Sequence, residues 1–324
     1  MSLSPTCNFL YCTEEAGDLV SLDADICDDF ESCGSFVHVD DDEENYIVSI
    51  FDSELDQLQG HELFSKYGKL PGIVTSRQEA IKWMLKVHSH YRFQPETAYL
   101  SVNYLDRFVL SHNLTGKEWH WRLLSVACLS LAAKMEETSV PLLLDLQLIE
   151  PRFLFKPKTV QRMELLVGSS LKWRLRSITP FDFLHYFISK ISYCSSPQHS
   201  NGFSSVISAA SDLIISTSRV IDFLDYPPST TAAAVVLWVT NQPVDDHKLE
   251  CLHKRLNKDM VKRCYSLVKR NMSQLLHIKL QKLEHCVPSN DKLGVSLLGR
   301  GDDETKSTKA CSEISAKTLG KINI

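Results

Sequence analysis

From about residue 45 to residue 285, apolar side chains recur with the 3.6-residue period of an α-helix. Proline, glycine and polar clusters interrupt this period, and no alternating strand pattern competes with it. The sequence therefore predicts an all-α fold. The predicted helices are 45–59, 76–92, 95–111, 119–137, 141–148, 157–173, 180–194, 203–224, 228–241, 245–256 and 258–281.

After the opening helix, the predicted helices form two sets of about five, similar in number and order. Pro95 and Pro228 each stand at a predicted start, where a missing backbone N–H costs nothing. In each set the third helix is apolar nearly all round, at 123–133 and 232–239, which is typical of a helix at the centre of a bundle. With 324 residues the chain also exceeds the usual size of a single core. We therefore expect two consecutive five-helix bundles with an extra N-terminal helix.

Charge is divided unevenly along the chain. Residues 1–65 carry 17 acidic residues and no Lys or Arg, whereas the remainder carries 35 basic and 23 acidic residues, a net charge of +12. An acidic segment without a sustained period repels itself, so we expect residues 1–44 to be a disordered leader. The basic residues of the body are scattered over helical faces without a concentrated run. This distribution favours solvated surfaces over nucleic-acid binding.

Several classes of function lack their signatures. No run of eighteen apolar residues and no secretory signal occurs, so we expect a soluble protein without membrane association. The ten cysteines include no CxxC pair. His88 and His90 are two apart and point to different faces of a helix, so they cannot share a metal. No nucleotide-binding glycine loop, HExxH or GxSxG motif is present. We expect no enzyme activity, no metal and no cofactor.

Two segments carry a family resemblance. The stretch His90–Phe108, which contains Arg92-Phe93-Gln94-Pro95, and the stretch Leu129–Thr138 together closely resemble the cyclin box of plant D-type cyclins. Arg162-Met163-Glu164, Leu171-Lys172-Trp173 and Thr179-Pro180-Phe181-Asp182-Phe183 follow at suitable separations. The resemblance covers residues 45–285 and weakens through the second bundle. It implies two cyclin-box bundles, with boundaries at 1–44 for the acidic leader, 45–178 for the N-terminal box, 179–285 for the C-terminal bundle and 286–324 for a flexible tail.

The resemblance implies a regulatory subunit that activates a cyclin-dependent kinase of the A type at the G1/S transition, in the nucleus and also in the cytoplasm. In the family a lysine and a glutamate grip the kinase, and they match Lys134 and Glu164 here. An ammonium donates to the carbonyls at a helix end, and a carboxylate accepts from backbone N–H groups. Taken alone, each charge would be read as part of a solvated helix face.

Near the N-terminus, Leu10, Cys12 and Glu14 match the LxCxE element by which D-type cyclins engage the retinoblastoma pocket. In an extended peptide these three side chains share one face, so they present two small apolar anchors and one acceptor. The resemblance therefore implies a retinoblastoma-related protein as a second partner.

The family also has a hydrophobic patch that docks RxL-type peptides of substrates and Kip-related inhibitors. Arg77 and Trp83 match this patch, whereas Ser76, Ala80 and Arg122 depart from it and weaken the expected docking. Ser76 and Glu79 could instead form a capping box at the start of a helix.

The resemblance leaves one alternative open, which is another cyclin-fold protein. A transcriptional cyclin or a transcription-factor-IIB-like adaptor should carry a zinc ribbon or a basic face, or lack LxCxE. This chain shows neither a zinc ribbon nor a basic face, and it has LxCxE.

Overall fold

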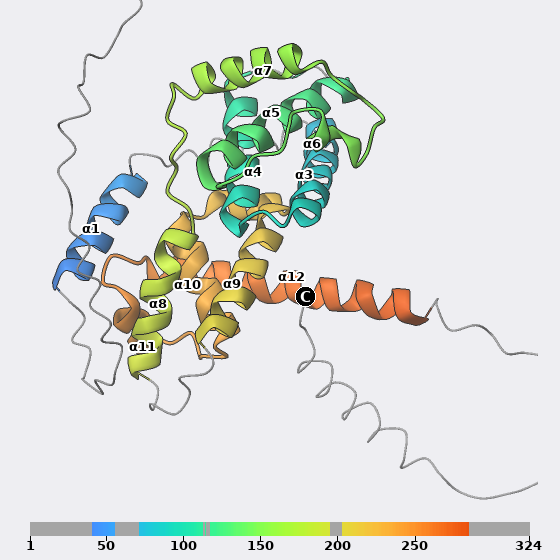
Figure 1. The fold of residues 1–324 in the computed structure, drawn as a ribbon. Helices are drawn as coiled ribbons and strands as arrows, with labels where there is room; N and C mark the ends of the chain where they lie inside the picture. The colour runs from blue at the N-terminus through green and yellow to red at the C-terminus, as the bar shows by residue number, and fades with distance from the viewer. Residues whose placement is uncertain (1–40, 56–70, 113, 115–116, 195–202, 285–324) are drawn as a thin grey trace, which may run out of the picture.

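The computed structural model describes residues 41–55, 71–112, 114, 117–194 and 203–284 (Figure 1). Within these residues the chain forms helices and turns without a strand, so the all-α prediction is confirmed. The predicted tail at 286–324 and all but the last four residues of the predicted leader lie outside the described part of the chain.

The first bundle is built around one buried helix. It contains α3 (Pro71–Tyr91), α4 (Pro95–Ser111), α5 (Glu118–Glu136), α6 (Asp145–Leu148) and α7 (Pro157–Ser170). Helix α5 contacts α3, α4 and α7, and its residues 123–133 are all buried. The central position predicted for this apolar segment is confirmed.

The second bundle repeats this plan. It contains α8 (Phe181–Cys194), α9 (Phe203–Ser218), the 3₁₀ helix η2 (Ile221–Asp225), α10 (Pro228–Val239), α11 (Asp246–Leu252) and α12 (Lys258–Glu284). Helix α10 contacts α8, α9 and α12, and its residues 229–237 are all buried. Figure 1 shows α12 continuing past the rest of the bundle.

Helix α1 (Asp41–Leu55) packs on the second bundle, although the sequence groups it with the first. Ile47, Ile50 and Phe51 are buried in the second core, where the Phe51 ring lies 5.0 Å from that of Phe183. Glu54 extends the same helical face, because positions 47, 50, 51 and 54 follow the i, i+3, i+4, i+7 spacing. That spacing predicts a buried face, but it does not say which bundle buries it.

Several of the predicted helix boundaries are wrong. Helix α1 begins at Asp41, four residues before the predicted start, so the last four residues of the predicted leader are helical. Helix α3 begins at Pro71, five residues before the predicted start. Ser76 therefore lies inside the helix, where its hydroxyl donates to the Gly72 carbonyl at 3.0 Å, and the capping box with Glu79 is not formed. The predicted helix 203–224 ends at Ser218 and is followed by η2.

A buried arginine contacts the end of α9. Arg77 on α3 pairs with Asp106 on α4 through two bonds of 2.7 and 2.8 Å. The same guanidinium donates to the carbonyls of Ser218 and Arg219 at 2.9 and 3.3 Å. In a continued helix these carbonyls would accept N–H groups four residues on, so α9 stops where the first bundle takes up its carbonyls. This clasp joins the two bundles.

Candidate functional site

The structure brings the two predicted kinase-binding residues together. Lys134 lies in the last turn of α5, and Glu164 lies within α7. The Lys134 ammonium donates to both Glu164 carboxylate oxygens, at 2.7 and 2.8 Å. The lysine side chain is 45% exposed and the glutamate side chain 8%. A cation at the C-terminal end of α5 also suits the helix dipole. The ion pair therefore sits at the edge of the first bundle, with its cation toward solvent.

Helix α5 is fixed at this end by a cap on its neighbour. Glu137 follows the last residue of α5, and its carboxylate accepts the backbone N–H of Gln94 at 2.7 Å and the hydroxyl of Thr97. Because a carboxylate at the N-terminus of α4 satisfies unpaired donors, this contact holds the α5 terminus against α4. Lys134 is presented from a fixed position as a result.

Large apolar side chains are exposed in the same two segments. Met135 follows Lys134, and Leu165 and Leu166 follow Glu164; their exposed fractions are 45%, 60% and 48%. The sequence motifs do not include these three residues, although two leucines beside a charged residue on α7 depart from a clean polar face. Exposed apolar side chains on the two helices that carry the ion pair are typical of a surface that binds another protein.

Trp173 is another large exposed apolar side chain, at 61%. Lys172 and Trp173 both have positive φ angles, 53° and 57°, and the Trp173 N–H donates to the Gly168 carbonyl at 2.8 Å. The indole lies over Gly168, where an added Cβ would stand 2.8 Å from the ring. The backbone turn and the missing Cβ together hold the ring in this exposed position.

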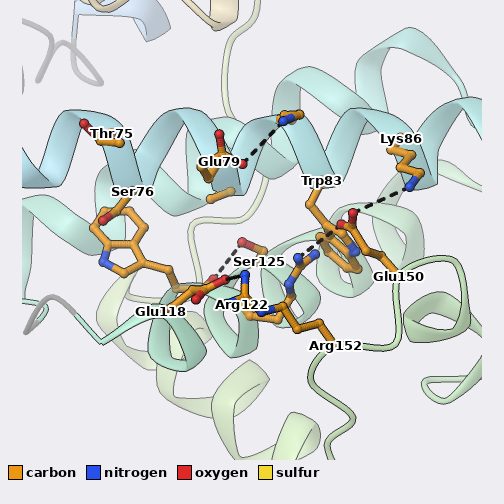
Figure 2. Close-up of a pocket in the computed structure, with 13 residues that line it drawn as sticks. Thr75, Ser76, Glu79, Trp83, Lys86, Glu118, Arg122, Ser125, Glu150 and Arg152 are labelled. Atoms are coloured by element: carbon orange, nitrogen blue, oxygen red, sulfur yellow. Dashed lines mark hydrogen bonds and ion pairs between the residues drawn. The ribbon is translucent and has the colours of Figure 1, made fainter.

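Of the predicted docking-patch residues, Ala80, Trp83 and Arg122 line one groove between α3 and α5, with a volume of about 330 Å³ (Figure 2). The Arg122 guanidinium lies 4.7 Å from the Trp83 ring centroid. Arg77 is not part of this groove, because it is buried in the clasp between the bundles. Its assignment to the patch is corrected on that ground.

Glu150 closes one side of the groove. Its carboxylate lies 3.2 Å from Arg122 and 3.6 Å from Lys86, and Figure 2 shows it reaching both. Slight burial would raise the pKa of Glu150, but the hydrogen bond from Arg122 and the charge of Lys86 hold that pKa below its ordinary value. Glu150 is therefore ionised at neutral pH.

Three further features of the sequence analysis concern the LxCxE element, metal sites and membrane-spanning helices. Leu10, Cys12 and Glu14 lie outside the described residues, so the LxCxE element stays a prediction. Among the described residues no group of His, Cys, Asp and Glu is arranged to hold a metal ion. None of the described helices has the length and apolarity that a bilayer crossing requires.

Two helical bundles, each built around a buried third helix, match the cyclin fold, and two family models match the same two parts of the chain. The model of the cyclin N-terminal domain matches residues 47–176, and that of the cyclin C-terminal domain matches residues 178–300. Two solved structures share the fold. A viral cyclin from herpesvirus saimiri has a TM-score of 0.52 at 18% identity, covering 62% of this chain and 85% of that one. A chain of the yeast TFIIK (Kin28/Ccl1/Tfb3) complex has a TM-score of 0.50 at 17% identity. The match covers 66% of this chain and 93% of that one.

Sequence relatives narrow the class. Cyclin-D1-1 of Arabidopsis thaliana is 40% identical over 268 residues, which cover 80% of this chain and 76% of the relative. Cyclin-D2-2 of Oryza sativa subsp. japonica is 42% identical over 240 residues, which cover 72% of this chain and 65% of the relative. Cyclin-D4-1 of Arabidopsis thaliana is 45% identical over 204 residues, which cover 61% of this chain and 65% of the relative. The chain belongs to the cyclin family and, within it, to the plant D-type cyclins. It is therefore a regulatory cyclin.

Proposed function

We propose that this cyclin is a non-enzymatic subunit that binds and activates an A-type cyclin-dependent kinase at the G1/S transition and directs it to a retinoblastoma-related protein in the nucleus. The observation that carries the kinase part is the Lys134–Glu164 pair, held at the edge of the first bundle among exposed apolar side chains. Such a surface suits an amphipathic helix, whose apolar face packs while its ends meet opposite charges.

The ion pair prepares both charges for a partner helix. Lys134 is the more exposed of the two and can donate to carbonyls at the C-terminal end of that helix. Glu164 is almost buried, so it accepts only from a group that comes close enough to exclude water. Pressing the αC helix of the kinase inward pairs its glutamate with the ATP-binding lysine, which completes the kinase site. In this proposal the cyclin positions the αC helix of the kinase and contributes no catalytic group.

A charge swap tests the kinase site while keeping the ion pair. Lys134→Glu combined with Glu164→Lys retains a cation beside an anion, so we expect a melting temperature close to that of the wild type. The swap exchanges the positions of the positive and negative charge that face the partner. Each charge-assisted hydrogen bond that is lost should weaken kinase binding about ten- to a hundredfold. Binding to purified A-type kinase is measured by calorimetry, and activation by phosphate transfer to histone.

The control swaps another ion pair of similar length. Lys262 and Asp246, 2.7 Å apart on the second bundle, lie far along the chain from the proposed site. Exchanging their charges should leave kinase binding unchanged. If the Lys134/Glu164 swap bound the kinase as tightly as the wild type, this surface would not be the kinase site.

A peptide of residues 5–20 tests the retinoblastoma part. Glu14→Ala removes the acceptor of a charge-assisted hydrogen bond and should weaken binding to an isolated pocket domain about ten- to a hundredfold. Leu10→Ala empties an apolar pocket and should weaken binding by a similar factor. Tyr11→Ala is the matched control, because Tyr11 points away from the shared face in an extended peptide. Equal affinities across this series, measured by calorimetry, would contradict the role given to LxCxE.

A further inference from the structure

One arginine on α4 is partly buried and held only by neutral groups. Arg107 packs against residues 171–180, the linker that joins α7 to α8. Its Nη1 donates to the Ser177 hydroxyl at 2.8 Å, the Arg174 carbonyl at 3.0 Å and the Asn103 side-chain oxygen at 3.4 Å. Within the described part of the chain, no carboxylate pairs with this guanidinium. Because a guanidinium stays charged at physiological pH, Arg107 places an uncompensated positive charge beside the linker.

The other two nitrogens of Arg107 are open to a ligand. Nε and Nη2 donate to no acceptor among the described residues, and neither belongs to the buried atoms that lack a partner, so solvent reaches both. These two nitrogens form one edge of the planar guanidinium, which can bind two oxygens of an oxyanion at once. Arg77 uses the same edge to bind the Asp106 carboxylate at 2.7 and 2.8 Å. In Arg107 three bonds to Nη1 fix the direction of this edge, and it is unoccupied by protein.

The linker adds positive charge and no acid. It contains no Asp or Glu, and its three cations are exposed: Lys172, Arg174 and Arg176. Arg176 lies 3.9 Å from Asp182, whereas no described carboxylate pairs with Arg174. Burial lowers the pKa of Arg107, and the nearby charge of Arg174 lowers that pKa further. The surface around Arg107 therefore has an excess of positive charge that an anion would neutralise.

We propose that Arg107 and the linker cations bind a phosphoryl group carried on a side chain of a partner protein. The open edge of Arg107 binds two phosphoryl oxygens, and the exposed Arg174 side chain approaches from solvent. A phosphoryl group brings nearly two negative charges and three strong acceptor oxygens, so it matches this excess of charge better than a carboxylate does.

The openness of the site favours a protein-borne phosphoryl group over a free ion. The linker cations are exposed, and water and salt screen exposed charges. Residues that flank the phosphorylated side chain can add contacts that a free ion lacks. This inference goes beyond kinase activation, for which no contact of Arg107 is used.

Selection from peptide pools tests for a phosphoryl ligand. The full-length cyclin is immobilised without kinase at physiological ionic strength. It is offered two pools of random octapeptides, one with a fixed central phosphoserine and one with a fixed central serine. We expect retention of the phosphoserine pool. Equal retention of both pools, or of neither, would overturn the proposal.

Two variants then locate the binding site. The best retained phosphopeptide is labelled with fluorescein and titrated by anisotropy. Arg107→Gln removes the open edge and should weaken binding about ten- to a hundredfold. It also removes bonds between α4 and the linker, so a second variant separates binding from folding. Arg174→Gln changes only an exposed side chain and should weaken binding about two- to fivefold at an unchanged melting temperature. Unchanged affinity in Arg174→Gln would contradict the proposal.

Arg270→Gln is the matched control, because it removes one positive charge from the second bundle, where Arg270 pairs with Asp222 at 3.3 Å. Its affinity for the phosphopeptide should equal that of the wild type. A loss as large as that of Arg107→Gln would mean that the peptide responds to the net charge of the protein and not to this site.

Competition with inorganic phosphate distinguishes the two sources of the phosphoryl group. We expect inorganic phosphate to displace the labelled phosphopeptide only at concentrations more than about tenfold above those at which the unlabelled phosphopeptide does so. Displacement at equal concentrations would identify free phosphate as the ligand and overturn the assignment to a partner protein. No kinase is present in these assays. A failure here therefore leaves the proposed kinase activation untouched, and a failure of the charge swap at Lys134 and Glu164 leaves this site untouched.

Discussion

At the scale of single residues, Trp173 shows how local backbone geometry creates an exposed apolar surface. A side chain with positive φ costs about 1–3 kcal/mol when the surroundings enforce it, and two consecutive residues adopt such angles here. The result is an indole that packs on Gly168 and still faces solvent. A large exposed indole suits a contact with another protein, so we add Trp173 to the binding surface proposed for the kinase.

Gly168→Ala should weaken kinase binding without unfolding the protein. Alanine normally stabilises a helix by about 0.5–1 kcal/mol over glycine, but its Cβ would stand 2.8 Å from the Trp173 ring. The ring is exposed and can swing outward, so we expect an unchanged or higher melting temperature, a shift in tryptophan fluorescence and lower affinity for the kinase. Ser169→Ala is the control at the exposed neighbouring position. If Gly168→Ala retained full kinase affinity, the position of Trp173 would not matter for binding.

Sequence identified Lys134 and Glu164 but not their mutual bond, because a motif gives positions along the chain and not distances in space. Arg77 shows the opposite error. The family resemblance placed it on the docking patch, whereas Asp106 and two backbone carbonyls satisfy it inside the molecule. Partners 29 and more than 140 residues away could not be read from its neighbours in sequence.

At the scale of helices, α1 completes the second bundle by capping its central helix. The Glu54 carboxylate accepts the backbone N–H of Ser229 at 2.6 Å and its hydroxyl at 2.7 Å. Ser229 lies in the first turn of α10, whose own N-cap, Pro227, offers no side-chain acceptor. A helix start without such a partner leaves donors unsatisfied. Helix α1 therefore supplies the hydrogen-bond acceptor that the sequence at the start of α10 lacks.

Glu54→Ala should lower the free energy of unfolding by about 1–3 kcal/mol, because buried donors at the start of α10 lose their acceptor. Burial raises the pKa of Glu54, and the bonds from Ser229 only partly oppose this. Since the pKa is higher in the folded than in the unfolded chain, ionisation reduces stability as pH rises above about 4.5. Glu54→Gln should lack that decline. Denaturant titrations at several pH values measure both effects.

Glu79→Ala, at an exposed position on α3, is the control and should change stability by less than about 0.5 kcal/mol. An equally small effect at Glu54 would mean that α10 does not depend on α1 for its cap.

The starts of α4 and α10 were predictable from the sequence, and the end of α9 was not. Pro95 and Pro228 begin α4 and α10 as predicted, because the reason for a proline in the first turn is local. The end of α9 at Ser218 coincides with a contact from Arg77 in the other bundle. A contact from a distant side chain leaves no mark in the sequence around it.

At the scale of the whole molecule, the Arg77–Asp106 clasp joins the bundles through a buried ion pair. Removing one partner of such a pair typically costs about 3–5 kcal/mol, because the other charge stays buried alone. Arg77→Met should therefore lower the free energy of unfolding by about that amount. Adding Asp106→Leu removes the stranded carboxylate, so the double variant should be more stable than Arg77→Met alone. Denaturant titration of the three proteins measures the difference.

The exposed pair Arg152–Glu118, at 2.6 Å, serves as the control, since its removal should cost less than about 1 kcal/mol. A double variant no more stable than Arg77→Met would show that the buried carboxylate is not the source of the loss.

The position of α1 also bears on how the protein is made. A ribosome finishes α1 early but must add about 200 further residues before α11 exists, which takes ten to forty seconds at roughly 5–20 residues per second. Throughout that time Ile47, Ile50 and Phe51 have no second bundle to bury them. A chain released early would keep an apolar helix uncovered near its N-terminus, a feature that chaperones and proteases recognise. The apolar face of α1 is therefore buried only after the second bundle has been synthesised.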